Sequence, residues 1–307
     1  MKHITVLQQE AVEALALSPE STVVDATFGS GGHAKMITTM LGPQGTYIGI
    51  DADPTAFEGQ SLQTKATVHL VNNNFRNIAD ILRSLHITQV DAVLADLGWR
   101  MEQFTDGRKG FSFNQDEPLL MTFGDPEHYP FTAYDIVNDW EEQSIADIIF
   151  GYGDERQARR IARAIVTARK TAPIETTQQL TTCIESVIPR KHFHKVHPAT
   201  KTFQALRIAV NDELGALEQF LKDGFAALAD EGHLAIITFH SLEDRVVKQY
   251  FRMLHDAGLG TLVTKKPIVA SEEELEANPR ARSAKLRIIT KQQRSSHYEP
   301  SSHNQPE

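Results

Sequence analysis

The sequence predicts an open α/β sheet that is interrupted by a long helical segment. Over the first third of the chain, short β-rich runs alternate with helical patterns. From about residue 104 to residue 200 no convincing strand pattern occurs, and afterwards the alternation resumes. Strands that are separated by helices form βαβ units, in which the strands are parallel and the crossovers right-handed.

The predicted strands are short runs of β-branched and aliphatic residues. Four of them precede the helical segment and two follow it; they are 22–26, 46–51, 67–71, 91–96, 233–239 and 285–290. A helix over 34–41 is expected to end at Gly42 and Pro43, because neither residue favours continuation of a helix. The tail from Gln292 is rich in Ser, His, Gln and Pro, and we expect it to be disordered.

The interrupting segment shows helical periodicity. Apolar residues at i, i+3, i+4 and i+7 predict one helix over 145–152 and a second over 158–165. Thr176 and Gln179 have the spacing of a capping box before a third helix. Beyond the segment, one further helix is expected to carry the apolar residues from Phe203 to Leu221.

Composition narrows the class of protein. With 307 residues, 41% of them hydrophobic, the chain can bury a sizeable core. The single cysteine, Cys183, excludes a disulfide framework and a cysteine-based zinc site. No apolar run approaches the roughly 20 residues of a membrane span, and the N-terminus lacks a signal peptide's apolar centre. We therefore expect a soluble cytoplasmic protein without a membrane partner; its oligomeric state is left open.

Histidines are numerous, which raises the question of a metal site. The chain has 13 of them, and three lie close together in sequence, at His192, His194 and His197. No cysteine or acid lies among these three residues, so a loop of solvated histidines is the better interpretation. We expect no metal.

Charge is unevenly distributed along the chain. The net charge is −9, but residues 156–201 contain ten Lys or Arg and only two acids. Such asymmetry indicates an anionic ligand on one part of the molecule, and the alternative is a set of solvated helix faces. Arg156, Arg160 and Arg163 are expected to share the polar face of the second predicted helix, opposite its apolar side.

A glycine turn follows the first strand, in the run Asp25-Ala-Thr-Phe-Gly-Ser-Gly-Gly-His33. Glycine has no Cβ and accepts positive φ, so the backbone can approach a ligand closely, and the following helix offers free N–H groups. Asp51 ends the second strand 20 residues after Gly31, where a ribose-binding carboxylate belongs. Asp96 ends the fourth strand at the same edge, where open α/β sheets bind their ligands.

The acids around the turn favour one class of ligand. A dehydrogenase must seat a pyrophosphate on the helix N-terminus. S-adenosyl-L-methionine has no phosphate and carries a ribose, an amino acid and a sulfonium cation, which Asp25, Asp51 and Asp96 suit better. A methyltransferase is therefore preferred to a dehydrogenase. The third interpretation is a turn that only packs a helix on a strand, with the acids as helix caps.

A hydrolase is disfavoured. Residues 240–244 contain the residue types of a catalytic triad, His-Ser-Leu-Glu-Asp. Triad members converge from separate segments of a chain, so their occurrence in one contiguous run argues against that chemistry.

Taken together, these segments resemble the ribosomal RNA small subunit methyltransferase H family, whose members methylate N4 of a cytosine in small-subunit rRNA. The similar stretches span nearly the whole chain, and the longest specific ones are 197–208 and 239–245. The others are 3–7, 25–33, 51–54, 96–98, 110–113, 158–166 and 278–287.

The resemblance implies a class I (Rossmann-like) methyltransferase fold with an inserted all-helical domain. The methyltransferase domain would comprise residues 1–107 and 205–290, the substrate-recognition insertion 108–204, and the tail 291–307. The implied partner is the small ribosomal subunit, with a target cytosine in the decoding region of 16S rRNA. The implied cofactor contacts are Gly31, Gly32, His33, Asp51, Phe75, Asp96 and Gln103.

The chemistry of that reaction suggests roles for particular residues. The lone pair of cytosine N4 is delocalised into the ring, so the enzyme must position the amine in line with the methyl group. We expect Asp96 to be catalytic, accepting a proton from the amine. Trp99 is a candidate to stack on the extruded base, or else a hydrophobic lid residue. The substrate-binding candidates are Trp99, Arg156, Arg160, Arg163, His240, Ser241 and Arg245.

Three segments depart from the family pattern. After Asp-Leu-Gly the family usually has Val-Ser-Ser, where this chain has Trp99-Arg100-Met101, and Lys109 replaces an arginine. Residues 119–124 read Leu-Leu-Met-Thr-Phe-Gly in place of Leu-Asp-Met-Arg-Met-Asp. Two alternatives therefore stay open: a catalytically altered or inactive cofactor-binding factor for rRNA or ribosome assembly, and a methyltransferase for another nucleic acid.

Overall fold

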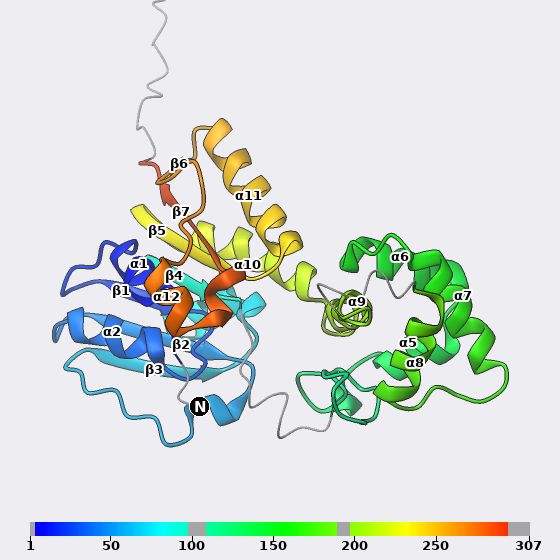
Figure 1. The fold of residues 1–307 in the computed structure, drawn as a ribbon. Coiled ribbons are helices and arrows are strands. Elements are labelled where there is room, and N and C mark those ends of the chain that lie inside the picture. Colours follow the sequence, from blue (N-terminus) through cyan, green and yellow to red (C-terminus); the bar gives the residue numbers. More distant parts are fainter. Residues whose placement is uncertain (1–3, 98–108, 189–196, 294–307) are drawn as a thin grey trace, which may run out of the picture.

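The computed structural model describes residues 4–97, 109–188 and 197–293. In this part of the chain seven strands form one sheet, in the order β3-β2-β1-β4-β5-β7-β6 (Figure 1). Strands β1 to β5 run parallel, whereas β7 is antiparallel to both β5 and β6. The strands are β1 Thr22–Asp25, β2 Thr46–Asp51, β3 Thr67–Asn72, β4 Val90–Asp96, β5 Leu228–Thr238, β6 Gly260–Leu262 and β7 Lys285–Lys291. The predicted open α/β sheet and its six predicted strands are confirmed, and only the three-residue β6 was not predicted.

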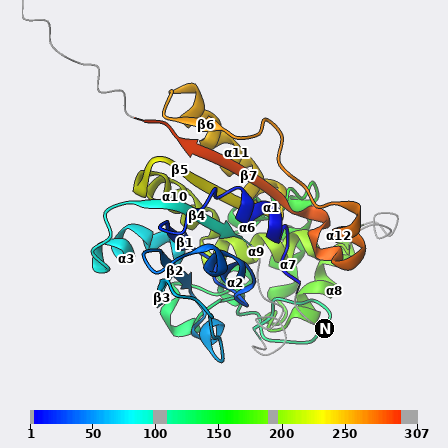
Figure 2. The same ribbon diagram turned by 90° about the vertical axis from the view of Figure 1, so that its left-hand side faces the viewer.

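Each face of the sheet has its own apolar core. Side chains alternate along a strand, so Val23 and Val24 of β1 enter different clusters. Helices α3 (Ile78–Ser84), α10 (Glu213–Ala227) and α11 (Ser241–Asp256) supply buried residues to the Val24 side. Helices α1 (Gln8–Glu13) and α2 (Gly32–Met40) supply the Val23 side, with α12 (Glu272–Ala277) beside them (Figure 2). The result is a three-layer α/β arrangement.

A separate core holds the helical part of the chain. Buried residues between Leu119 and Val210 form a third cluster, which lies beside the sheet in Figure 1. Its helices are α5 Ala133–Asp139, α6 Glu142–Gly153, α7 Ala158–Arg169, α8 Thr177–Val187 and α9 Thr200–Asn211. The helices predicted over 145–152 and 158–165 and the capping box of Thr176 and Gln179 are confirmed. The domain boundary that we expected after residue 204 falls inside α9.

The single helix predicted from Phe203 to Leu221 is wrong. It is two helices, α9 and α10, separated at Asp212, whose φ of 47° is left-handed. The apolar spacing continues through both helices, and such spacing does not report a break at a single residue. Short 3-10 turns complete the described structure: η1 Pro54–Phe57, η2 Phe75–Asn77, η3 Pro126–His128 and η5 Pro279–Ser283. Among the described helices, none combines the length and apolarity needed to span a membrane.

Candidate active site

The glycine turn connects β1 to α2, and its glycines meet two steric requirements. Gly29 and Gly31 have φ values of 55° and 71°, a left-handed conformation that other residues adopt at a cost. Gly31 is the N-cap of α2. A Cβ on Gly32 would lie 1.7 Å from Oγ1 of Thr5, so a side chain is excluded there. The turn therefore lets the backbone come close to a ligand at the carboxyl edge of the sheet.

Asp51 ties this turn to the end of β2. One of its carboxylate oxygens accepts the backbone N–H of Gly29 at 2.8 Å, and the other accepts that of Asp53 at 2.9 Å. These bonds hold the carboxylate at the carboxyl edge of the sheet.

Asp96 lies at the end of β4, two strands away from Asp51 in the sheet. Its backbone N–H donates to Oγ1 of Thr27 at 2.6 Å. Oδ2 of Asp96 lies 4.0 Å from Nδ1 of His33, whose side chain is almost fully buried. Two acids and a histidine from three segments therefore meet at one edge of the sheet.

A cavity of about 680 Å³ opens at this edge. Its volume is in the range typical of small-molecule sites. Five of the predicted cofactor residues line it, namely Gly32, His33, Asp51, Phe75 and Asp96. Gly31 is buried at the N-cap beside the cavity, and Gln103 lies outside the described residues.

The helical region contributes an aromatic wall to the same cavity; the wall consists of Phe111, Phe113, Phe123, Tyr129 and Phe203. The rings of Phe111 and Phe123 stack with centroids 5.6 Å apart and planes inclined by 17°. Phe113 packs edge-on against Phe203. Sequence reasoning did not identify these residues as site residues, although 110–113 was among the stretches similar to the family.

Residues 119–124, which depart from the family pattern, are held through their backbone. Asn211 of α9 accepts the N–H of Phe123 at 2.9 Å and donates to the carbonyl of Met121 at 2.7 Å. Nζ of Lys109 donates to the carbonyl of Gly124 at 2.7 Å. Met121 is buried, so this segment is packed into the core even though it lacks the family's charged residues. Its fold brings the ring of Phe123 to the cavity.

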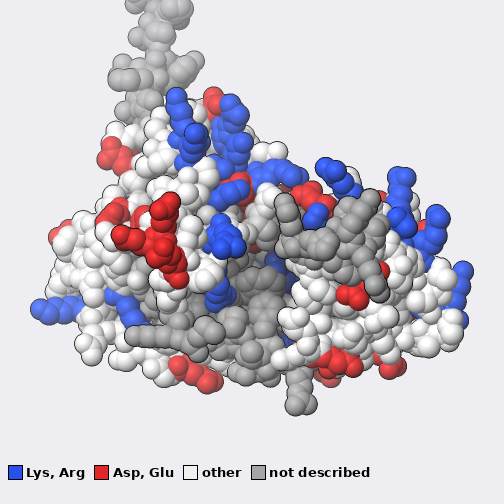
Figure 3. Space-filling view, in the orientation of Figure 1, with Lys and Arg blue, Asp and Glu red and all other residues white. Residues whose placement is uncertain are grey.

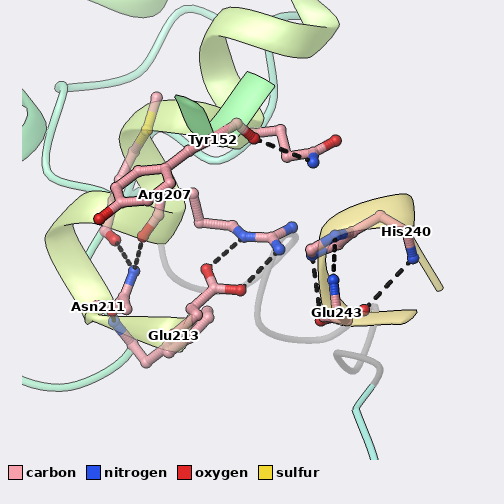
Figure 4. Close-up of polar contacts among 9 residues, drawn as sticks. Tyr152, Arg207, Asn211, Glu213, His240 and Glu243 are labelled. Atoms are coloured by element: carbon pink, nitrogen blue, oxygen red, sulfur yellow. Dashed lines mark hydrogen bonds and ion pairs between the residues drawn. The ribbon is translucent and has the colours of Figure 1, made fainter. Parts of the chain in front are cut away.

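A buried polar cluster closes another part of the cavity wall. Arg207 of α9 donates from Nε and Nη2 to the two carboxylate oxygens of Glu213, at 2.6 and 2.7 Å. In Figure 4 its guanidinium points toward the end of α11 that carries His240 and Glu243. Those two residues form a capping box, in which Glu243 accepts the N–H of His240 and His240 Nδ1 accepts the N–H of Glu243. Hydrophobic periodicity does not predict this cluster. It marks apolar residues as buried, whereas Arg207 is a buried charge on an amphipathic helix.

The geometry of this cluster favours hydrogen bonding over metal binding. Potential ligand atoms of Glu213, His240 and Glu243 lie within 4.8 Å of one another. However, both oxygens of Glu213 already accept bonds from Arg207. Nδ1 of His240 accepts the backbone N–H of Glu243, and Nε2 lies 3.1 Å from Oε1 of the same residue, so both ring nitrogens already have polar neighbours.

The predicted substrate residues divide between two places. His240 lines the cavity, whereas Arg160 and Arg163 line a separate groove of about 710 Å³ between α7 and α8. Arg156 precedes α7, which begins at Ala158, so the prediction that it shares a helix face with the other two is wrong. The helix begins where its apolar spacing begins, so it does not extend back to Arg156. Trp99 lies outside the described residues.

Ser241 and Arg245 lie on α11, outside the cavity lining. Both contact Asp154 at the C-terminal end of α6: Oγ of Ser241 lies 3.3 Å, and Nη2 of Arg245 3.7 Å, from its Oδ2. Through these contacts Ser241 and Arg245 join the sheet part of the protein to the helical part.

Two further expectations about single residues need correction. Asp25 does not face the cavity, since it is 1% exposed and accepts a hydrogen bond from the hydroxyl of Tyr47 at 2.8 Å. Burial raises the pKa of Asp25 to about 6. His197 does have an acidic neighbour, because Nε2 lies 3.2 Å from Oε1 of Glu185, which is remote from the histidine run in sequence but adjacent in space. His192 and His194 lie outside the described residues.

Comparison with known proteins identifies the family. The model of the MraW methylase family matches residues 1–292. The Ribosomal RNA small subunit methyltransferase H of Brevibacillus brevis is 44% identical over 94% of this chain and 98% of its own length. Proteins of the same name from Symbiobacterium thermophilum and Deinococcus radiodurans are each 46% identical, over 95% and 93% of this chain and 97% and 88% of their own lengths. The chain therefore belongs to the MraW methylase family.

Proposed function

We propose that this protein uses S-adenosylmethionine to methylate N4 of a cytosine in the decoding region of 16S rRNA. The observation that carries the proposal is one cavity that joins the glycine turn, Asp51 and Asp96 to an aromatic wall from the helical region. The names of the relatives, small subunit rRNA methyltransferases, support this substrate class. A cytoplasmic location follows from such a substrate and is part of the proposal.

The residues present suit the cofactor. Backbone at Gly29 and Gly32 approaches the cavity without a Cβ, and Asp51 offers carboxylate oxygens to ribose hydroxyls. Phe75 supplies an apolar surface on the same wall. When bound, S-adenosylmethionine supplies an electrophilic methyl group on a sulfonium. We assign Gly31, His33 and Gln103 to the same cofactor site on the family resemblance.

Asp96 is proposed as the catalytic residue. A carboxylate beside the exocyclic amine accepts one of its N–H bonds, which localises the nitrogen lone pair for attack, and it takes the proton that the product must lose. The side chain of Asp96 is about one-fifth exposed, and its Oδ2 lies 4.0 Å from Nδ1 of His33. The bond from its backbone N–H to Thr27 fixes the end of β4, which places the carboxylate at the cavity.

The aromatic wall is proposed to hold the target base. A base that is methylated at an exocyclic amine must leave its stack, and aromatic side chains replace the lost stacking. Phe123 presents a ring on the cavity wall and is itself stacked on Phe111, which fixes its plane. Trp99 stays a candidate for the same task.

Recognition of the RNA backbone is assigned to the helical region. Residues 108–204 are proposed as a substrate-recognition insertion in a methyltransferase domain of 1–107 and 205–290. Arg160 and Arg163 line the groove between α7 and α8, where they are placed to contact phosphates without reading sequence.

One experiment tests the proposal. The protein and labelled S-adenosylmethionine are incubated with small subunits from a strain that lacks the modification, and the product is mapped by nucleoside mass spectrometry. We expect N4-methylcytidine at one position in the decoding region. Cofactor binding without any labelled nucleoside would instead support the catalytically inactive factor that the changes at 119–124 suggest, and a different labelled nucleoside would support another nucleic-acid methyltransferase.

A further inference from the structure

A row of cations lies on the exposed face of α11. Arg245, Lys248 and Arg252 occupy positions i, i+3 and i+7, and all three are exposed. The opposite face of the helix packs on the sheet through Val247 and Phe251, which are buried. Because the apolar face fixes the rotation of the helix, these cations, here called the α11 stripe, must face solvent.

The acids of α11 do not cancel this charge. Glu243 is buried in the capping box with His240. Asp244 accepts hydrogen bonds from Lys285 and Arg287 at 3.0 and 2.7 Å. Burial opposes ionisation of Asp244, but these bonds outweigh it and lower the pKa, so the carboxylate is ionised and already paired.

Asp256 is the remaining acid of the helix. It lies 3.9 Å from Arg252, and both side chains are more than two-thirds exposed. An exposed ion pair at that distance is weak and screened by salt, so the guanidinium stays available to a stronger anion.

The α11 stripe lies close to the helical region. Asp154, at the end of α6, contacts both Ser241 and Arg245 in the first turns of α11. The residues that follow Asp154 lead directly into α7, with Arg159 and Arg160 exposed. Figure 3 shows Lys and Arg side chains along the upper edge of this face, over α11 and again over the helical region.

Residues of both the sheet part and the helical part line the cavity, and each part carries one of these two groups of cations. His240, the N-cap of α11, lines the cavity, so the helix begins at the cavity wall and its cations follow farther along it. The three residues of the α11 stripe span about 10 Å along the helix axis. Evenly spaced cations with no aromatic side chain among them suit a phosphate backbone better than bases.

We infer that the α11 stripe binds the phosphodiester backbone of the RNA whose target base enters the cavity. Arg160 and Arg163, here called the α7 cations, would contact the same RNA from the other side of the cavity. This inference rests on the proposed function. Contacts on both sides would hold the strand across the cavity and thereby position the base, although neither contact reads sequence. An acidic ribosomal protein is the competing partner.

The test compares two double variants of the full-length protein. Lys248→Gln/Arg252→Gln removes two cations that contact neither the cavity nor Asp154. Lys65→Gln/Arg83→Gln, the control variant, removes an exposed Lys that precedes β3 and an exposed Arg on α3. Like Arg252, Arg83 is paired with an aspartate of its own helix. Affinity is measured against intact small subunits and against protein-free rRNA from them, over a range of salt concentrations, together with cofactor affinity and N4-methylcytidine formation.

We expect the α11 variant to bind both RNA samples about ten-fold more weakly at low salt, with a log–log salt slope reduced by about 2. Cofactor affinity should be unchanged, and the control variant should behave as the wild type. Unchanged binding of the α11 variant, while the wild type methylates the subunit, overturns the inference and leaves the proposed function standing. Weakened binding to the intact subunit alone assigns the stripe to a ribosomal protein and also overturns it. A wild type that neither binds nor methylates the subunit removes both proposals.

Discussion

Arg207 and Glu213 form a bidentate ion pair across the one-residue break between α9 and α10. Arg207 lies on a helix whose apolar residues belong to the helical core, whereas Glu213 begins a helix that packs on the sheet. At the break itself, Arg76 donates to both the carbonyl and the side chain of Asp212, at 3.1 and 3.0 Å. The pair therefore links the helical core to the sheet part of the protein, at a point where both residues line the cavity.

Glu213→Gln should destabilise the protein, because it removes the negative charge to which the buried guanidinium of Arg207 donates two hydrogen bonds. We expect a loss of about 3 kcal/mol in the free energy of unfolding, measured by urea denaturation. The matched control is Glu142→Gln, whose partner Arg163 is 77% exposed, and which should lose less than about 1 kcal/mol. Equal losses in the two variants would show that the buried pair contributes no more to the free energy of unfolding than the exposed pair does.

Asp51 and Asp96 should separate binding from turnover. Asp51→Ala removes the acceptor assigned to the ribose and the bond to Gly29, so cofactor affinity should fall by about ten-fold or more. Asp96→Ala should lower single-turnover methylation by about 10²–10⁴ while changing cofactor affinity less. Calorimetric binding and single-turnover kinetics measure the two effects. Full activity in both variants would place the site elsewhere.

Asp25 should make stability depend on pH. Its pKa is about 6 in the folded protein against an ordinary value of 3.8, so the native state binds this proton more tightly than the unfolded chain does. The contribution of the group is fully present below pH 3.8 and is lost as pH rises through about 6. Relative to the wild type, Asp25→Asn should therefore gain about 3 kcal/mol between those limits.

Urea unfolding of both proteins at several pH values measures that difference. Asp80→Asn is the control, since Asp80 is 71% exposed and pairs with Arg83 on the surface. A difference between Asp25→Asn and the wild type that stays constant with pH would mean that Asp25 is ionised normally despite its burial.

Phe123 should matter to the RNA substrate and not to the cofactor. Stacking of a base on an aromatic ring is worth about 1–3 kcal/mol, so Phe123→Leu should lower kcat/KM for small subunits by about ten-fold and leave cofactor affinity unchanged. Phe150→Leu is the control, because Phe150 is 64% exposed on α6 and does not line the cavity. If both variants methylate equally well, the base is held by another group.

The α7 cations should contribute long-range, salt-sensitive affinity. Arg160→Gln/Arg163→Gln removes two exposed charges from the groove between α7 and α8. Binding to small subunits should weaken, and its log–log salt slope should fall by about 2, as measured by filter binding. An unchanged slope would mean that α7 only packs against its neighbours.

Features that depend on local spacing were predictable. The six strands, the glycine turn and the positions of Asp51 and Asp96 follow from apolar runs and from the residues that end them. The break at Asp212 was not predictable in this way, because the apolar face continues on both sides of it. Arg156 was assigned to the face of α7 although it precedes Ala158, the first residue of the apolar spacing and of the helix.

By itself, the sequence determined an α/β sheet with a glycine turn and an acid at the ends of two strands, and its motifs determined the family. Parallel strands place their carboxyl ends at one edge, so residues that end strands meet without further information. Only the tertiary structure decided which distant side chains complete the cavity. Phe123 reaches it because Asn211, 88 residues away, holds its backbone, and Asp25, which local reasoning turned toward the ligand, is buried against Tyr47. The first contact lies within the helical region and the second joins the paired strands β1 and β2. Both connect residues that are distant in sequence, and no local periodicity records such a connection.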